Sequence, residues 1–221
     1  MLELNNASYE YRLKGRRIKI FEGIKHEFAR GSFTSITAPS GQGKTTLLNI
    51  LGLLDSLTAG EYMVSGQNVN NLNDKAKSAL RSEIFGFLFQ DYRLIPTLTV
   101  FDNINLALEI KYNNDKKYTQ EVMRVLTMVD LADRAKHLPA ELSGGESQRV
   151  AFARAIVKQP KVLLADEPTG NLDEKNRDHL LSLIKDFHQS GNTIVMVTHD
   201  VVAAKQAEFV LKLEKAKLRF Q

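Results

Sequence analysis

The chain contains no cysteine, so disulfides and thiolate metal sites are excluded. It also lacks a long apolar run, because one of the longest, residues 47–54, is interrupted by Asn49 and Gly52. Nothing approaches the roughly 20 consecutive apolar residues that a helix needs to span a bilayer. The first eleven residues contain two glutamates and no apolar centre, so we expect no signal peptide.

A strong charge bias is missing as well. The 30 basic and 26 acidic residues give a formal net charge of +4 at pH 7. This excess is compatible with an anionic ligand or a membrane-proximal surface, but it is too small and too dispersed to indicate binding to nucleic acid. With 221 residues, 43% of them hydrophobic, the chain can form one large domain or a domain with an inserted subdomain.

The chain does contain apolar strands that alternate with helices. The pattern predicts helices near residues 45–54, 175–189 and after residue 145, and strands near residues 2–9, 18–24, 32–37, 60–69, 84–89, 162–165 and 194–198. This alternation predicts an α/β fold with a mostly parallel sheet. Residues 91–142 interrupt it with a helical pattern in which Val122, Leu126 and Val129 share one face, so we expect an inserted helical subdomain there.

A glycine-rich segment, APSGQGKTT at residues 38–46, lies between a predicted strand and a predicted helix. Gly41 and Gly43 let backbone N–H groups approach phosphate oxygens, and the helix N-terminus adds a favourable dipole. Lys44 would reach the β- and γ-phosphates, and the Thr45 hydroxyl would bind Mg²⁺. The alternative is an ordinary glycine-rich turn. The residues expected at the nucleotide are Ala38, Pro39, Ser40, Gly41, Gln42, Gly43, Lys44, Thr45 and Thr46.

The segment departs from the pattern G-x-x-x-x-G-K-[ST] at one position, because Ala38 stands where the first glycine belongs. Ala38 precedes Pro39, which favours an extended backbone with negative φ. Alanine accepts that geometry, so the expected cost is small. A required positive φ would instead cost on the order of 1 kcal/mol.

A pair of carboxylates, Asp166 and Glu167, ends the apolar run VLLA at residues 162–165. Open α/β sheets bind ligands at the carboxyl ends of their strands. Asp166 would hold Mg²⁺ directly or through water, and Glu167 could polarise the attacking water as a general base. A solvated acidic turn is the alternative, which the phosphate loop about 120 residues upstream disfavours.

Four single polar residues complete the candidate site, each with a plain structural alternative. Gln90 ends a predicted strand and could contact the γ-phosphate or the metal, or simply cap the strand. His199 could orient Glu167 and bond the γ-phosphate as a neutral imidazole. Tyr11 could stack on adenine, in competition with Tyr9. Asp173 could reach across a dimer interface or cap the helix that follows it.

A second phosphate-binding segment, LSGGESQRVAFARA, occupies residues 142–155. Ser143, Gly144, Gly145 and Glu146 stand at the start of a predicted helix, where backbone N–H groups can bind phosphate. The segment carries no lysine and cannot hydrolyse a nucleotide by itself. It is therefore one half of a site whose other half lies elsewhere.

Together these motifs resemble, in order, those of the nucleotide-binding domain of ABC transporters. Residues 38–46 resemble Walker A and residues 162–167 Walker B, while Gln90, residues 142–155, residues 171–173 and His199 resemble the Q-loop, the signature, the D-loop and the switch histidine. The resemblance covers nearly the whole of residues 1–221. It implies a P-loop NTPase (RecA-like) core with an N-terminal antiparallel β subdomain in residues 1–90 and 143–221, and an inserted α-helical subdomain in residues 91–142.

The same resemblance implies an ATPase that uses ATP and Mg²⁺. Catalysis is expected from Glu167, His199, Lys44 and Gln90, and metal binding from Thr45, Gln90 and Asp166. Two copies would sandwich two ATP molecules, each between one copy's site and the other's Ser143–Glu146 segment. An integral membrane permease is the expected partner, which implies a place at the cytoplasmic face of the (inner) membrane. The sequence also predicts a contact with the membrane subunit in residues 92–101, with Leu94, Ile95 and Leu98 exposed, and the alternative is packing within the helical insertion.

The segments at residues 84–104 and 166–173 look like the subgroup that contains the MacB, LolD and FtsE cassettes. Such cassettes drive export or the handling of extracytoplasmic substrates. Two alternatives stay open: an FtsE-like regulatory cassette that signals through a membrane partner without transport, and a cassette ATPase that acts on nucleic acid or ribosomes. The latter usually joins two cassettes in one chain or carries a long coiled coil, and this chain has neither.

Overall fold

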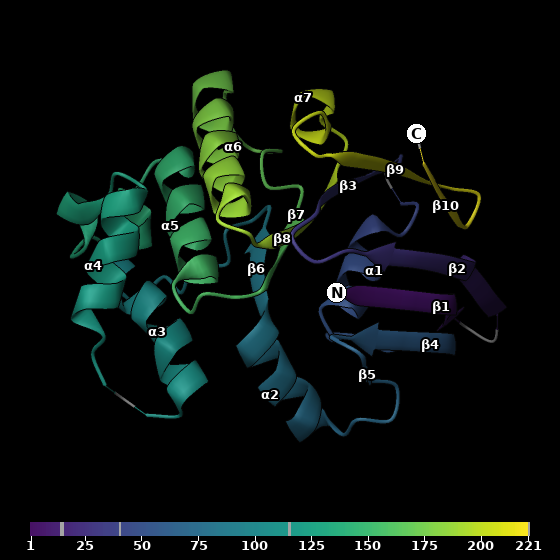
Figure 1. Cartoon of the computed structure of the whole chain (residues 1–221). Coiled ribbons are helices and arrows are strands. Elements are labelled where there is room, and N and C mark those ends of the chain that lie inside the picture. The colour runs from purple at the N-terminus through teal and green to yellow at the C-terminus, as the bar shows by residue number, and fades with distance from the viewer. Residues whose placement is uncertain (14–15, 40, 115, 221) are drawn as a thin grey trace.

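The computed structural model describes residues 1–13, 16–39, 41–114 and 116–220. Ser40, expected at the nucleotide, lies outside these residues. The described part of the chain forms two sheets and a set of helices, with α3, α4 and α5 at one side and the strands β1, β2 and β4 at the other (Figure 1).

The smaller sheet is antiparallel and has the strand order β2-β1-β4-β5. Its strands are β1 (Leu2–Leu13), β2 (Arg16–Phe28), β4 (Ala59–Val64) and β5 (Gln67–Asn68). Several of its apolar side chains, among them Leu2, Leu4 and Phe21, are buried. This sheet confirms the predicted N-terminal antiparallel β region.

The larger sheet has the order β10-β9-β3-β8-β7-β6, in which every neighbouring pair except β9 and β10 is parallel. The strands are β3 (Phe33–Thr37), β6 (Phe85–Phe89), β7 (Val162–Asp166), β8 (Thr193–Thr198), β9 (Phe209–Glu214) and β10 (Lys217–Phe220). Because parallel strands end at one edge, Asp166 at the end of β7 lies at the same edge as the phosphate loop, Gln90 and His199, which follow β3, β6 and β8. The predicted α/β fold is confirmed.

The helices cover the larger sheet and form one side of the molecule. They are α1 (Lys44–Leu51), α2 (Asp74–Ile84), α3 (Val100–Tyr112), α4 (Thr119–Met128), α5 (Gly144–Ile156), α6 (Glu174–Gln189) and α7 (Val201–Ala204), with 3₁₀ turns η1 (Ala132–Arg134) and η2 (Pro139–Glu141). Val122, Leu126 and Val129 are fully buried, as their shared face predicts. None of the helices in the described residues is long and apolar enough to cross a membrane.

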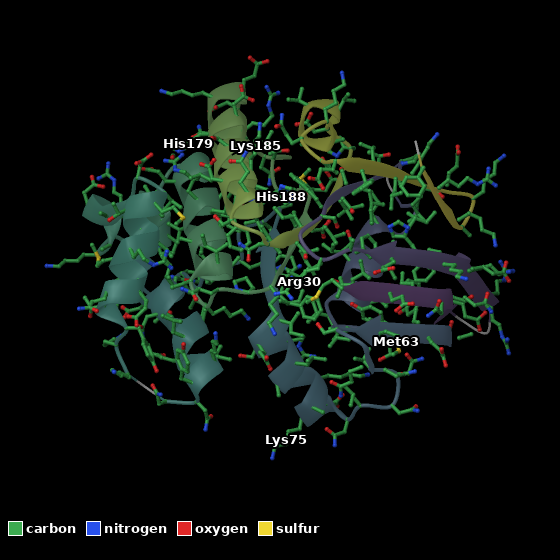
Figure 2. The ribbon with its side chains drawn as sticks, in the orientation of Figure 1. Arg30, Met63, Lys75, His179, Lys185 and His188 are labelled. Atoms are coloured by element: carbon green, nitrogen blue, oxygen red, sulfur yellow. The ribbon has the colours of Figure 1, made fainter. Side chains whose placement is uncertain are left out.

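Two apolar cores lie on opposite faces of the larger sheet. One face, with Leu163 and Met196, packs with α3, α4, α5 and α6. The opposite face, with Leu164 and Val195, packs with α1 and the antiparallel sheet. This follows from the period of two in a strand, which sends consecutive side chains to opposite faces. A hydrogen bond also connects the C-terminal end of α6 to the segment before β3. The Nε2 of His188, labelled in Figure 2, donates to the carbonyl of Gly31 at 2.8 Å.

Three elements lack a strong sequence signal. Helix α2 buries only Ile84, and side chains such as Lys75 point into solvent, so no apolar stripe marks it (Figure 2). Strands β9 and β10 form a hairpin whose turn places Lys215 and Ala216 at φ 49° and 62°. Such turns usually contain glycine or asparagine, which are absent here.

The division of the chain into residues 91–142 and the remainder stays a prediction. Helix α5 lies outside that range, yet it packs in the same core as α3 and α4. The apolar contacts of residues 91–142 are therefore continuous with those of the larger sheet.

Candidate functional site

The phosphate loop follows β3 and leads into α1. Gly41 and Gly43 have φ of 77° and 89°, the left-handed region that glycine enters without strain. A Cβ at Gly43 would lie 2.2 Å from Cγ2 of Ile20, so the loop also approaches β2 too closely for a side chain. Ala38 is not among the residues with positive φ, which agrees with its expected extended backbone. Its substitution for glycine therefore imposes no left-handed strain.

Lys44 contacts two partners at the start of α1. Its Nζ donates to the carbonyl oxygen of Ala38 at 2.6 Å and lies 3.4 Å from Oε1 of Glu167. Both side chains are largely shielded from water, with 9% and 12% of their surfaces exposed. The ion pair offsets the cost of burying two charges, each of which would be unfavourable alone.

Glu167 is held from two further directions. Its backbone has a φ of 45°, and its N–H donates to the carbonyl of Val197 at 2.9 Å, which fixes this left-handed position against β8. Its Oε2 accepts hydrogen bonds from the backbone N–H of His199 at 3.0 Å and from the ring Nδ1 at 2.9 Å. Strained backbone of this kind clusters at functional sites.

The His199 ring therefore carries its proton on Nδ1, because a carboxylate only accepts. A neutral ring in this tautomer has an acceptor, not a donor, at Nε2. The expected neutral imidazole can thus orient Glu167, but donation to a phosphate oxygen as well requires the protonated ring. The ring is 65% exposed, so Nε2 is open to such a contact.

Thr45 and Asp166 form the best-fitting metal position. The Thr45 hydroxyl donates to Oδ1 of Asp166 at 3.2 Å, so two hard oxygen ligands lie within the span of one small cation. Burial raises the pKa of the Asp166 carboxyl, and the Thr45 hydrogen bond partly offsets this. The described residues contain no group of three or more Asp, Glu, His or Cys side chains that could hold a metal, so Mg²⁺ here would draw its other oxygens from phosphates and water.

A cavity of about 340 Å³ opens beside the phosphate loop. Its lining comprises Tyr11, Ile20, Gly41, Gly43, Lys44, Thr45, Thr46 and Glu167. The Tyr11 Oη lies 3.3 Å from Oγ1 of Thr46, whereas Tyr9 is buried and donates its hydroxyl to Asp55. Of the two competing tyrosines, Tyr11 is thus the one at the cavity. Ile20 was missed, because only the hairpin register of β1 and β2 brings it there.

The signature segment forms a capped helix start away from this cavity. Ser143 accepts from the N–H of Glu146 at 3.2 Å, and Oε2 of Glu146 accepts from the N–H of Ser143 at 2.8 Å, a reciprocal capping box. These backbone and side-chain bonds from Ser143 lower the pKa of Glu146. None of residues 143–146 is among those lining the cavity.

The two signature glycines also have packing roles that the sequence does not reveal. A Cβ at Gly145 would lie 2.2 Å from Oδ1 of Asn176, and one at Gly144 would lie 2.9 Å from the Tyr92 hydroxyl. The absence of side chains therefore lets α5 approach α6 and the segment after β6.

Gln90 and Asp173 lie on neighbouring loops outside the cavity lining. Gln90 bonds the side chain of Asn171. Asp173 caps α6 by accepting from the N–H of Asn176 at 2.8 Å, which lowers the pKa of its carboxyl. The capping alternative for Asp173 is therefore observed, and its reach across a dimer interface stays a prediction.

Known proteins share this arrangement. Residues 21–170 match the family described as ABC transporter. An uncharacterized ABC transporter ATP-binding protein, YvrO of Bacillus subtilis (strain 168), is 42% identical over 208 residues, which cover 94% of this chain and 91% of YvrO. The macrolide export ATP-binding/permease protein MacB of Chlorobaculum tepidum is 37% identical over 97% of this chain, which spans 33% of that longer protein.

Solved structures agree with the sequence relatives. The post-hydrolysis dimer of the ATP-binding cassette MJ0796, bound to ADP and Pi, superposes with a TM-score of 0.93 at 36% identity, covering 100% of this chain and 98% of the other. A second dimeric structure of the same cassette, described as a bacterial ABC transporter cassette, has a TM-score of 0.92. The chain therefore belongs to the ABC transporter family as an ATP-binding cassette that hydrolyses ATP.

Proposed function

We propose that this cassette is the ATP-hydrolysing subunit of a membrane transporter complex and works as a homodimer around two ATP molecules. The observation that carries the proposal is the separation of two half-sites within one chain. The cavity is lined by Lys44, Thr45 and Glu167 but by none of the signature residues 143–146. The helix start at Ser143 therefore does not contribute to the cavity of its own chain. The dimers named for the cassette MJ0796 support the pairing of one copy's cavity with the other's signature.

Within one site, Lys44 would bind the terminal phosphates, and Tyr11 would support the adenine. Mg²⁺ held by Thr45, Asp166 and Gln90 would neutralise charge on the phosphates. When the Lys44 side chain turns to a phosphate, it gives up its 3.4 Å ion pair with Glu167. Glu167 then keeps the hydrogen bonds from His199 and gains the freedom to accept a proton from the attacking water.

The membrane partner is proposed to dock between β6 and the helices α3 and α5. A groove of about 280 Å³ there combines the apolar side chains of Phe89, Leu106 and Ile110 with the cations Arg154 and Lys158. Burial, with a smaller contribution from Lys111, lowers the pKa of Lys158 to about 8, so the amine is still charged at neutral pH. This chemistry fits a short permease helix with an apolar face and a carboxylate.

The expected contact at Leu94, Ile95 and Leu98 needs correction. Leu94 packs against the helical core, and Leu94 and Leu98 are only partly exposed, which leaves Ile95 as the exposed one of the three.

We further propose a MacB- or LolD-like role in export or in the handling of extracytoplasmic substrates, at the cytoplasmic face of the membrane. The MacB proteins among the relatives support this subgroup, since their names join the cassette to a permease in one chain.

Replacing the proposed general base tests the dimer model. Glu167→Gln removes the proton acceptor but keeps the shape of the side chain, so phosphate release should fall at least about 100-fold. ATP binding should persist, and light scattering should show a dimer in ATP. Glu61→Gln, at an exposed position on β4, is the matched control and should behave as wild type.

Ser143→Arg tests the shared site from the other half. It should block the ATP-dependent dimer while one copy still binds ATP. Hydrolysis at the full rate in Ser143→Arg would show that each chain works alone and would overturn the shared-site model.

A further inference from the structure

Gln90 and Asn171 form a reciprocal pair beside the nucleotide cavity. The Gln90 Nε2 donates to Oδ1 of Asn171 at 3.3 Å, and the Asn171 Nδ2 donates to the backbone carbonyl of Gln90 at 3.2 Å. The Gln90 amide is therefore turned toward the loop after β7, and Gln90 is not among the residues that line the cavity.

The loop is shaped to receive this amide. A Cβ at Gly170 would lie 2.8 Å from Nε2 and 3.3 Å from Cδ of Gln90. Gly170 does not have a positive φ, so backbone conformation alone does not require glycine there. The missing side chain instead provides the space in which the Gln90 side chain lies.

The two backbones that carry the pair are tied together independently of it. The fully buried Gln148 donates from Nε2 to the carbonyls of Phe89 at 3.2 Å and Pro168 at 2.7 Å. Phe89 precedes Gln90 and Pro168 lies in the Asn171 loop. A side-chain rotation of Gln90 can therefore break the bond from its Nε2 to Asn171, while the backbones and the bond from Asn171 to the Gln90 carbonyl stay in place.

We propose that Asn171 is a positioning residue that holds Gln90 away from the metal position until the cassette is loaded. The proposal rests on the proposed function, in which Gln90 contacts Mg²⁺. To supply its amide oxygen to the cation, the Gln90 side chain has to give up its hydrogen bond to Oδ1 of Asn171. Because Asn171 lies two residues before Asp173, the metal contact of Gln90 is linked to the state of this loop.

Two variants open the pair by different means. Asn171→Ala removes both hydrogen-bonding atoms. Gly170→Ala keeps Asn171 and fills the space, which displaces only the flexible end of Gln90. Both should tighten Mn²⁺ binding to the cassette loaded with a non-hydrolysable ATP analogue, measured by electron paramagnetic resonance. The expected change is about fivefold, which corresponds to one net hydrogen bond.

The matched control is the same pair of variants in a Gln90→Ala background, where neither should change Mn²⁺ binding. An unchanged Mn²⁺ affinity in Asn171→Ala, or an equal change with and without Gln90, would overturn the proposal. Loss of metal contact by Gln90 itself is a separate outcome: if Gln90→Ala leaves Mn²⁺ affinity intact, the metal role in the proposed function fails.

The pair has its own readout in the protein without nucleotide. The side-chain amide resonance of Gln90 in ¹⁵N spectra, assigned by its absence in Gln90→Ala, should shift in both Asn171→Ala and Gly170→Ala. A resonance that is identical in wild type and both variants would show that the pair does not form in solution.

Discussion

Gly145 is the position at which one added methyl group has the most clearly defined consequence. A Cβ there would lie 2.2 Å from Oδ1 and 2.3 Å from Cγ of Asn176, distances that real side chains do not reach. Gly145 does not have a positive φ, so its backbone accepts alanine. Gly145→Ala must therefore displace the Asn176 side chain, whose Oδ1 accepts a 3.0 Å hydrogen bond from Nη1 of Arg149.

The net effect on stability follows from two opposing contributions. A hydrogen bond from a charged, partly buried donor contributes about 1.5–3 kcal/mol. Alanine in place of glycine within a helix returns about 0.5–1 kcal/mol. Gly145→Ala should therefore lower the free energy of unfolding by about 0.5–2.5 kcal/mol. In an Asn176→Ala background the obstacle is gone, and the same substitution should be neutral or stabilising by up to about 1 kcal/mol.

Urea unfolding of the four proteins, followed by circular dichroism, measures both differences. A loss of the same size in the two backgrounds would refute the steric argument. Phosphate release by the double variant then separates two roles of the glycine: recovery of hydrolysis indicates that packing alone requires Gly145, and inactivity at full stability indicates a role at the partner's nucleotide.

Two further predictions concern the cavity and the metal position. Burial raises the pKa of the Asp166 carboxyl in the folded state above its value in the unfolded chain, which is about 3.9. The ionised carboxyl therefore destabilises the folded state, progressively as pH rises from the unfolded to the folded pKa and fully above the folded pKa. Asp166→Asn should accordingly raise the melting temperature at pH 7, and calorimetry should show the gain disappearing below about pH 4; a gain that is constant with pH would contradict this. Tyr11→Ala should weaken ATP binding about tenfold through loss of the ring, whereas Tyr11→Phe keeps the ring and should bind nearly as wild type, as isothermal titration can measure. Equal losses in the two Tyr11 variants would mean that the hydroxyl, 3.3 Å from Thr46, matters more than the ring.

The sequence predicts this fold best where an apolar period is long and a chemical motif lies beside it. The strands that end at Asp166 and Thr198 are buried on both faces, and their apolar runs are visible without any structure. Helix α2 has no such run: Ile84 is its one fully buried side chain among the described residues, Leu80 is only partly buried, and Asn73 caps its start. The sequence analysis does not predict the β9–β10 hairpin, because β9 depends on pairing with β3, β10 pairs with β9, and the turn contains no glycine.

The site shows the same limit at the level of single side chains. The sequence predicts which residues come to the edge of the sheet, because strand ends converge there. It does not predict that Lys44 contacts Glu167, that His199 holds the same carboxylate, or that Gln90 turns to Asn171. These contacts join residues 32 to 123 positions apart, and they depend on loop backbones, such as the left-handed Glu167, that no local propensity specifies.

The two cores on either side of the larger sheet limit how this protein can be divided. Residues such as Val125 and Leu126 on α4 belong to the same core as Leu163 and Met196 on the sheet. Removing residues 91–142 would expose the apolar side chains that they cover in the remaining protein. It would also expose the apolar side chains of the removed segment. We therefore expect that the helical segment does not fold on its own, and that hydrogen exchange reports its core and the sheet opening together in one cooperative event.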